Sequence, residues 1–576
     1  MRKPIIYQML PRLWGNTNVS NVKGGSLTQN GSGKFSDVDE VTLEYLKWLG
    51  CSHVWYTGVI RHSTAENPDN QGNMVKDSKA QLLKGKAGSP YAIKDYFDVN
   101  PYLADKPSRR MQEFSSLVAR THKAGLKVII DFVPNHVARD YGKTVRKGME
   151  PYVLGATDDC SVHWKAENDF YYYPGEKLQL PGNEAFGPED RFEEDPAKAT
   201  GNAFTSAPSI NDWYETVKIN YCDFHTQTWD KMAEVIKYWT SKGVDGFRCD
   251  MVELVPPEFF AWLIPFIKKE FPNLIFIAEV YDKSQYGKYI KQVGFDYLYD
   301  KSGLYDTVRG IVEGWGSATG ITSNWQMLGD LQPNMLCFLE NHDEQRFASE
   351  FFGKDARHSY AALYASLLLN TSPFMLYAGE ELGERGMDAE GFSGRDGRTT
   401  IFDWWSVESL RHLHDMIHFS EFVDHKPVGL NDYESEVFAR YSEVMRLARQ
   451  SRAITEGQTY DLCWCNAKTE GFDANRHFIF LRHAASDGTV SNGTASNGTA
   501  SNGSASNGSA AADASAAIAQ YNETLLVACN FSSESAKFKA HIPSEALEFL
   551  QIKTSTPDGI DVDINLAPYD ACAISL

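Results

Sequence analysis

The amino-acid sequence predicts an α/β protein: a closed (β/α)8 TIM barrel with an inserted domain after the third strand and a C-terminal antiparallel β-sandwich. Strand-length apolar segments alternate with helix-length amphipathic segments up to residue 452. This alternation is typical of a parallel sheet, and eight such units indicate a closed barrel. The alternation stops over residues 137–219, and short strands separated by turns follow residue 452. A doubly wound open sheet is disfavoured, because no G-x-G-x-x-G follows the first strand.

Each predicted barrel strand is a short apolar run, as expected where both faces of a parallel strand are buried. The segment LKVIIDFVPNH, residues 126–136, is the clearest example. The predicted strands are 5–10, 53–59, 126–136, 243–250, 273–280, 295–300, 335–343 and 374–383, and the predicted helices are 41–49, 107–124, 226–242, 257–270, 359–369 and 434–451.

These elements divide the chain into three domains. The barrel is assigned to residues 1–136 and 220–452, the inserted domain to 137–219 and the β-sandwich to 453–576. The inserted region is rich in glycine, proline, asparagine, aspartate and aromatic residues, and it is too long for a simple loop. A repetitive tract of glycine, serine and asparagine at 491–510 cannot offset its ordering entropy by burial, so we predict a flexible loop over 484–518.

Composition narrows the class of partner. The formal net charge of −20 disfavours nucleic acid and anionic membranes, which both require basic patches, and it fits a neutral ligand. No stretch is long and apolar enough to span a bilayer. The nine cysteines include no CxxC pair, and we interpret Cys463 and Cys465 as part of an alternating strand. A cytoplasmic protein is expected, or a secreted or periplasmic one if a leader has been removed; the oligomeric state is not indicated.

The segment GVDGFRCDMVE, residues 243–253, ends a predicted strand on an arginine and a carboxylate. Arg248 and Asp250 are two residues apart, so their side chains lie on the same face of a strand. A neighbouring arginine favours an ionised carboxylate and lowers its pKa, which suits a carboxylate nucleophile. A structural ion pair at the strand end is the alternative.

Polar residues stand at the ends of several other predicted strands. The carboxyl ends of barrel strands surround one site, so these side chains are expected to converge there. Each alone could be a structural acid or a cap, but a joint arrangement favours function. They are Tyr91 after the second strand, Asp131 and His136 on the third, Arg248 and Asp250 on the fourth, Glu279 on the fifth, and His342 and Asp343 on the seventh.

Three facing carboxylates indicate glycoside hydrolysis, in which one ionised carboxylate attacks the sugar and a second, protonated one assists the leaving oxygen. Glu279 follows the apolar run IFIA, so we expect an apolar setting that raises its pKa. Asp343 can bind sugar hydroxyls, and Tyr91 offers an aromatic face. A metal site is the rival interpretation, and Arg248 among the acids counts against it.

Four stretches resemble, in order, the signature regions of the α-amylase superfamily, glycoside hydrolase family 13: DFVPNH (131–136), GFRCDMVE (246–253), IAEV (277–280) and FLENHD (338–343). SPYAIKDY and SPFMLYAGEELG resemble the family's second- and eighth-strand elements. The resemblance implies that Asp250 is the nucleophile, Glu279 the general acid/base and Asp343 the transition-state stabiliser. It also implies the candidate sugar-binding residues, which are Tyr91, Asp131, His136, Arg248, Glu253 and His342.

The resemblance raises the question of calcium. Asn135 matches one calcium ligand of the true amylases, whereas Ser209 and Leu254 stand where two others are expected. Asp140 and Asp212 are nearby in sequence and are alternative ligands. We expect no cofactor to be required, and we expect calcium to be dispensable.

The resemblance therefore implies a retaining glycoside hydrolase that cleaves α-glucosidic bonds, α-1,4 above all, in starch-like glucans and maltooligosaccharides. A glucosyl transferase or a sucrose- or trehalose-active enzyme of the same superfamily is the first alternative, since the same site serves both. A non-catalytic sugar-binding relative is the second, and the three carboxylates argue against it.

Overall fold

The computed structural model describes residues 3–386, 392–419, 429–484, 524–552 and 558–576. Within these ranges eight parallel strands close into a barrel in the order β1-β2-β7-β12-β13-β14-β15-β16, as predicted. Nearly every strand residue is buried, which explains the continuous apolar runs of the sequence. The strands are β1 (Ile5–Met9), β2 (His53–Tyr56), β7 (Lys127–Phe132), β12 (Gly246–Cys249), β13 (Ile275–Ala278), β14 (Tyr297–Tyr299), β15 (Met335–Phe338) and β16 (Phe374–Tyr377).

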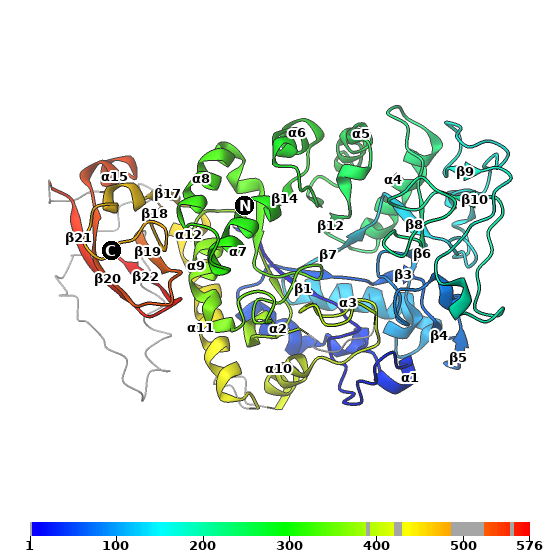
Figure 1. Ribbon diagram of the computed structural model, residues 1–576, viewed down its shortest axis with the longest axis horizontal. Coiled ribbons are helices and arrows are strands. Elements are labelled where there is room, and N and C mark those ends of the chain that lie inside the picture. Colours follow the sequence, from blue (N-terminus) through cyan, green and yellow to red (C-terminus); the bar gives the residue numbers. More distant parts are fainter. Residues whose placement is uncertain (1–2, 387–391, 420–428, 485–523, 553–557) are drawn as a thin grey trace.

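Amphipathic helices surround the barrel (Figure 1). Helix α3, for example, buries Phe114, Leu117 and Val118 and leaves His122 and Lys123 exposed. No helix in the described ranges combines the length and apolar character needed to cross a membrane. The longer helices are α2 (Glu40–Trp48), α3 (Arg110–Lys123), α4 (Gln227–Ser241), α5 (Pro257–Lys268), α8 (Thr319–Leu328), α9 (Tyr360–Leu368), α10 (Glu408–Phe419) and α11 (Asp432–Gln450).

The region between β7 and α4 is largely irregular. It contains two short antiparallel pairs: β8 (His136–Ala138) with β11 (Thr216–Lys218), and β9 (Tyr172–Tyr173) with β10 (Ala197–Lys198). Asp169 fastens it to the barrel layer, because its carboxylate accepts hydrogen bonds from Lys231 Nζ at 2.6 Å and Thr228 Oγ1 at 2.8 Å on α4.

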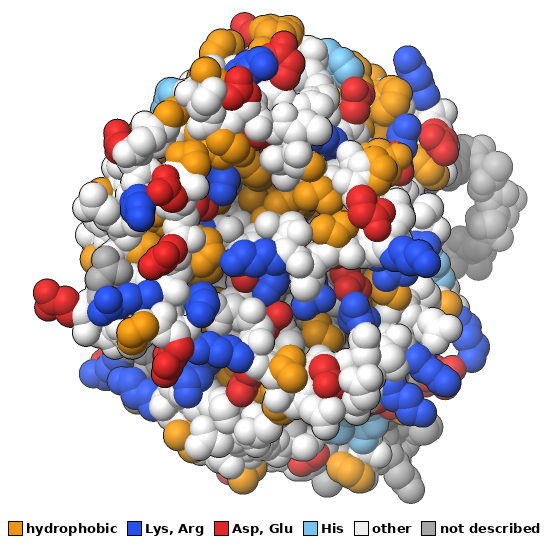
Figure 2. Space-filling model, turned by 90° about the vertical axis from the view of Figure 1, so that its right-hand side faces the viewer, with side chains coloured by type: hydrophobic (Ala, Val, Ile, Leu, Met, Phe, Trp, Pro, Cys, Tyr) orange, Lys and Arg blue, Asp and Glu red, His pale blue; other side chains and the backbone are white. Residues whose placement is uncertain are grey.

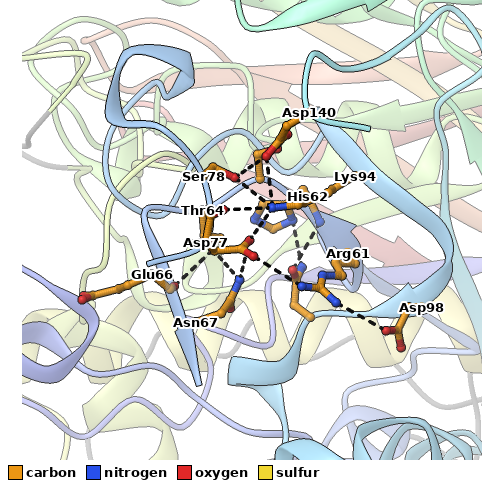
Figure 3. Close-up of polar contacts among 12 residues, drawn as sticks. Arg61, His62, Thr64, Glu66, Asn67, Asp77, Ser78, Lys94, Asp98 and Asp140 are labelled. Atoms are coloured by element: carbon orange, nitrogen blue, oxygen red, sulfur yellow. Dashed lines mark hydrogen bonds and ion pairs between the residues drawn. The ribbon is translucent and has the colours of Figure 1, made fainter. Parts of the chain in front are cut away.

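The segment after β2 is also elaborated, with β3 (Ile60–His62) paired to β6 (Ile93–Val99) and a hairpin of β4 (Glu66–Pro68) and β5 (Met74–Lys76). A buried polar network fixes it (Figure 3). Lys94 Nζ lies 3.0 Å from both Asp77 and Asp140, and Asp140 also accepts a hydrogen bond of 2.6 Å from Ser78. Because Asp140 follows β8, the network joins the segment after β2 to the beginning of the inserted region.

The C-terminal region lies at the opposite end of the molecule from β9 and β10 (Figure 1). A four-stranded antiparallel sheet, β17-β18-β19-β22, and the pair β20-β21 enclose a second apolar core. The predicted loop over 484–518 falls outside the described residues, apart from residue 484. The strands are β17 (Gln458–Asp461), β18 (His477–His483), β19 (Thr524–Asn530), β20 (Ala536–Ile542), β21 (Ile560–Leu566) and β22 (Ala571–Ser575).

One predicted strand in this region is wrong in extent. The interpretation of Cys463 and Cys465 as alternating strand residues fails, because β17 ends at Asp461 and Cys463–Asn466 forms a helical turn, α13. The Asp461 side chain accepts a hydrogen bond of 2.7 Å from the Cys463 N–H and so turns the chain out of the sheet. Strand β21 was not predicted, although its sequence IDVDINL alternates apolar and polar residues.

Candidate active site

The carboxyl ends of the barrel strands bring the candidate residues together. In the strand register Arg248 on β12 lies beside Asp131 on β7 and Ile277 on β13. The backbone N–H of Asp250 bonds to β7 through the carbonyl of Phe132, and the N–H of Glu279 bonds to β12 through that of Cys249. The ends of three adjacent strands thus place Asp250 and Glu279 next to one another.

Arg248 contacts all three candidate catalytic carboxyls. Its guanidinium lies 2.6 Å from Asp250 Oδ1, 3.0 Å from Glu279 Oε2 and 3.9 Å from Asp343 Oδ2. The guanidinium also lies within 5.5 Å of the ring centres of three aromatic residues, and it is 1% exposed. A planar, permanently charged group of this kind fixes several carboxylates at once. The aromatic residues are Trp55, Tyr91 and Tyr299.

Glu279 does not lie in the apolar setting that the sequence led us to expect. Besides Arg248, its carboxylate accepts a 2.9 Å hydrogen bond from the N–H of Met251 and a hydrogen bond from the Tyr281 hydroxyl. Met251 has φ +45°, in the left-handed region that non-glycine residues rarely adopt. That conformation, directly after Asp250, turns the Met251 N–H toward Glu279, so local backbone strain contributes to the site.

The expectation of a lowered Asp250 pKa is also wrong. Burial raises the pKa of Asp250 to about 8, and the opposing influence of Arg248 does not compensate. Desolvation by the pocket walls, and then the charge of Glu279, raise the pKa of Asp343 to about 7. Asp250 and Asp343 lie beside the same guanidinium and both have raised pKa values, so this pair of carboxyls retains a proton near neutral pH.

Tyr91, His342 and Asp131 form a second row beside Arg248. The Tyr91 hydroxyl bonds to His342 Nε2 and lies 3.3 Å from Asp131 Oδ1, and the Tyr91 and His342 rings stack at 5.3 Å. Gln8 donates from Nε2 to His342 Nδ1 at 2.8 Å, which leaves Nε2 as the protonated nitrogen, 3.1 Å from Asp343 Oδ2. Burial lowers the pKa of His342 well below its usual value, so the ring is neutral at pH 7.

Two further candidates have different environments. His136 lines the pocket, packs against the Trp213 ring at 5.2 Å, and has a pKa lowered to about 3 by burial. Glu253 does not line the pocket: its carboxylate accepts hydrogen bonds from the backbone N–H groups of Tyr281 at 2.8 Å and Asp282 at 3.0 Å. We therefore correct the prediction of direct sugar contact for Glu253 to a positioning role.

Five of the candidate residues line a cavity of about 220 Å³: Tyr91, His136, Asp250, Glu279 and Asp343. Sequence reasoning missed several of its residues, most of which come from the segment after β2, the inserted region and the segment after β16. Met251 and Tyr281 did have a sequence signal, since they stand one residue after Asp250 and two residues after Glu279. The lining residues are Lys84, Ser89, Tyr91, His136, Trp213, Glu215, Thr216, Asp250, Met251, Glu279, Tyr281, Asp343, Ile401 and Phe402.

The residues around Asn135 do not fit a calcium ion. Lys218 Nζ donates a 2.6 Å hydrogen bond to Asn135 Oδ1 and lies 3.3 Å from the carbonyl oxygen of Leu254. An ammonium group thus occupies the space between the two oxygens that a cation would need. Asp140 is engaged by Lys94 and two serines, and Asp212 accepts from Ser209. In the described residues no cluster of three histidine, cysteine or acidic side chains is arranged to hold a metal.

Comparisons with known proteins agree with this arrangement. Residues 8–273 match the family model of the alpha amylase catalytic domain. Alpha-amylase 3 of Dictyoglomus thermophilum is 23% identical over 384 residues, which cover 64% of this chain and 68% of that protein. The amino acid transporter heavy chain of Rattus norvegicus is 25% identical over 253 residues, covering 43% of this chain and only 29% of that protein.

Among solved structures, the alpha-amylase of Geobacillus thermoleovorans complexed with acarbose has a TM-score of 0.59 at 17% identity, over 99% of this chain and 97% of that one. This likeness shows a shared fold. The closed barrel, the clustered carboxyls and the matching relatives define the protein class as a glycoside hydrolase. The match over residues 8–273 places this catalytic region in the α-amylase superfamily, glycoside hydrolase family 13.

Proposed function

We propose that the protein hydrolyses α-1,4-glucosidic bonds in maltooligosaccharides and starch-like glucans with retention of configuration. The observation that carries the proposal is the binding of Asp250, Glu279 and Asp343 to the single guanidinium of Arg248. A retaining mechanism needs two neighbouring carboxyls on one sugar, about 5–5.5 Å apart. The family match and the amylase relative support the substrate class.

In the first step the proton that Asp250 and Asp343 retain passes through Glu279 to the glycosidic oxygen, and the ionised Asp250 attacks C1 of the glucosyl unit as the C1–O bond breaks. In the second step Glu279 takes a proton from water, and the water oxygen attacks C1 and releases Asp250. Asp343, with His342 behind it, accepts hydrogen bonds from sugar hydroxyls. The products are the α-anomer of the released sugar and the shortened chain.

The distribution of charge on the surface is also compatible with a neutral ligand. On the face that carries the inserted region, acidic and basic side chains are interspersed around apolar ones (Figure 2). A surface without a single-signed field does not concentrate a polyanion, whereas hydroxyl groups can bond to side chains of either sign.

Transfer to a second sugar is the alternative fate of the glycosyl-enzyme. The Tyr281 ring is 37% exposed beside Glu279, and it offers a face on which an acceptor sugar can stack. The same assay separates the two outcomes, because transfer yields products longer than the substrate.

The experiment is proton NMR of a maltoheptaose digest, followed from the first minute, with pullulan, isomaltose and sucrose as further substrates. We expect α-anomeric signals to appear before mutarotation and maltoheptaose to be the best of the four. Initial formation of the β-anomer would contradict the double displacement, and a preference for isomaltose or sucrose would contradict the α-1,4 assignment.

A further inference from the structure

We propose that the pocket is closed at the end that holds the non-reducing side of the substrate, so that the enzyme cleaves terminal units and does not bind mid-chain. This inference rests on the proposed function and specifies the substrate end. Its observations are a charged pair, Lys84 and Glu215, and a backbone bridge between Ala87 and Phe402, which together form one wall of the cavity.

The chemistry identifies which wall faces which end of the substrate. The group that protonates the leaving oxygen stands on the side of the departing sugar, so β13, which carries Glu279 and Tyr281, marks that side. In the closed barrel β1 is diametrically opposite β13, and β2 and β16 flank β1. The segments that follow β2 and β16 therefore border the position of the non-reducing sugar.

These two segments meet. The Ala87 N–H donates a 2.9 Å hydrogen bond to the carbonyl oxygen of Phe402. Gly85, at φ +66°, permits the approach, since a Cβ there would lie 2.2 Å from the same oxygen. Lys84 Nζ lies 3.0 Å from Glu215 Oε1 in the inserted region, and both side chains are largely buried. Three segments, distant in sequence, thus join into a continuous wall.

The wall is anchored at several points. The segment after β2 carries the buried network of Figure 3, in which Lys94 pairs with Asp77 and Asp140. The N–H of Ala65 bonds to the carbonyl of Lys86 at 2.9 Å, close to the wall itself. Buried ion pairs and backbone hydrogen bonds of this kind resist displacement, so we expect the wall to stay in place when substrate binds.

Glu215 reinforces the wall from the inserted region. It is 5% exposed and lines the cavity, and its Oε2 is closed to solvent, so its contribution to the wall is the ion pair of its Oε1 with Lys84. The cavity of about 220 Å³ is also smaller than typical small-molecule pockets of about 300–1,000 Å³.

The test compares three substrates on the wild-type protein: maltoheptaose labelled at its reducing end, the same chain blocked by a 4,6-O-benzylidene group at its non-reducing end, and β-cyclodextrin. We expect the labelled chain to shorten from its free end, and the blocked and cyclic substrates to react at least about 100-fold more slowly. Labelled fragments of random length from the first minutes, with all three substrates consumed at similar rates, would overturn the inference.

Two variants test whether the ion pair between Lys84 and Glu215 contributes to closing the pocket. Lys84→Ala removes the tie between the two segments and should raise the rate on blocked relative to free maltoheptaose about 10-fold. Lys86→Ala, on the same segment with an exposed side chain, is the matched control and should leave the ratio unchanged. If Lys84→Ala folds and the ratio is unchanged, the ion pair does not contribute to closing the pocket. If this variant does not fold, the comparison of the three substrates on the wild-type protein alone tests the proposal.

Failure of the proposed function has a different signature. If none of the α-glucans is consumed, the hydrolase assignment fails, and calorimetry with maltose and its 4,6-O-benzylidene derivative then tests the closed wall separately. Weaker binding of the blocked sugar would support the wall, and equal binding would refute it.

Discussion

Lys218 donates a hydrogen bond of 2.6 Å from its Nζ to the Oδ1 of Asn135, the residue that resembles a calcium ligand. The same ammonium lies 3.3 Å from the carbonyl oxygen of Leu254. Burial lowers the pKa of Lys218 to about 8, so the group remains mostly charged at pH 7. The side chain therefore supplies a positive charge between the inserted region and the barrel without any metal ion.

The first prediction follows from this contact. We expect EDTA to change neither the melting temperature nor the activity, whereas Lys218→Met should lower the melting temperature by several degrees because the polar oxygens around it lose their donor. Lys106→Met, at an exposed lysine, is the control. A fall in melting temperature with EDTA, reversed by calcium, would show that another ligand set exists.

The second prediction concerns the nucleophile. Asp250→Asn keeps the shape of the side chain and its place beside Arg248, but the amide cannot form the glycosyl-enzyme. We expect turnover of maltoheptaose to fall by at least about 10³-fold while the circular dichroism spectrum is unchanged. A folded variant with near-native turnover would require a different nucleophile.

The third prediction concerns pH and stability. The pKa of Asp250 is raised to about 8 in the folded protein, whereas an unfolded aspartate titrates near pH 4. Between those values the folded state keeps a proton that the unfolded state has released, so stability falls as the pH rises, and the full loss is present above about pH 8. Asp250→Asn removes this pH-dependent loss of stability, because an amide does not titrate.

Calorimetry across the pH range measures the effect. We expect Asp250→Asn to raise the melting temperature at pH 9 by on the order of 1–4 °C and to have little effect near pH 4. Asp105→Asn, at an exposed position, should show no such difference. A gain of equal size at both pH values would point to a cause other than titration.

The fourth prediction tests Glu253 as a positioning residue. Its carboxylate holds the N–H groups of Tyr281 and Asp282, and Tyr281 in turn bonds to Glu279. Glu253→Ala should lower kcat about 10-fold with a smaller change in KM, and Glu253→Gln, which keeps an acceptor oxygen, should recover part of the loss. A rise in KM alone would instead favour the original expectation of sugar contact.

The sequence by itself determined the barrel, the order of its strands and the residues at the strand ends. These features depend on local patterns: a strand buried on both faces reads as an apolar run, and the residue that follows it must lie at the rim. The convergence of Arg248, Asp250, Glu279 and Asp343 could therefore be predicted before any coordinates were available.

The tertiary structure decided what surrounds those residues. The donors around Glu279, the net rise in the pKa of Asp250 and the contact of Lys218 with Asn135 all depend on which segments meet in space. The pair of Lys84 and Glu215 joins the segment after β2 to the inserted region, where the sequence shows no periodicity to indicate a fold. Desolvation and long-range pairing are properties of the assembled chain, and no local pattern encodes them.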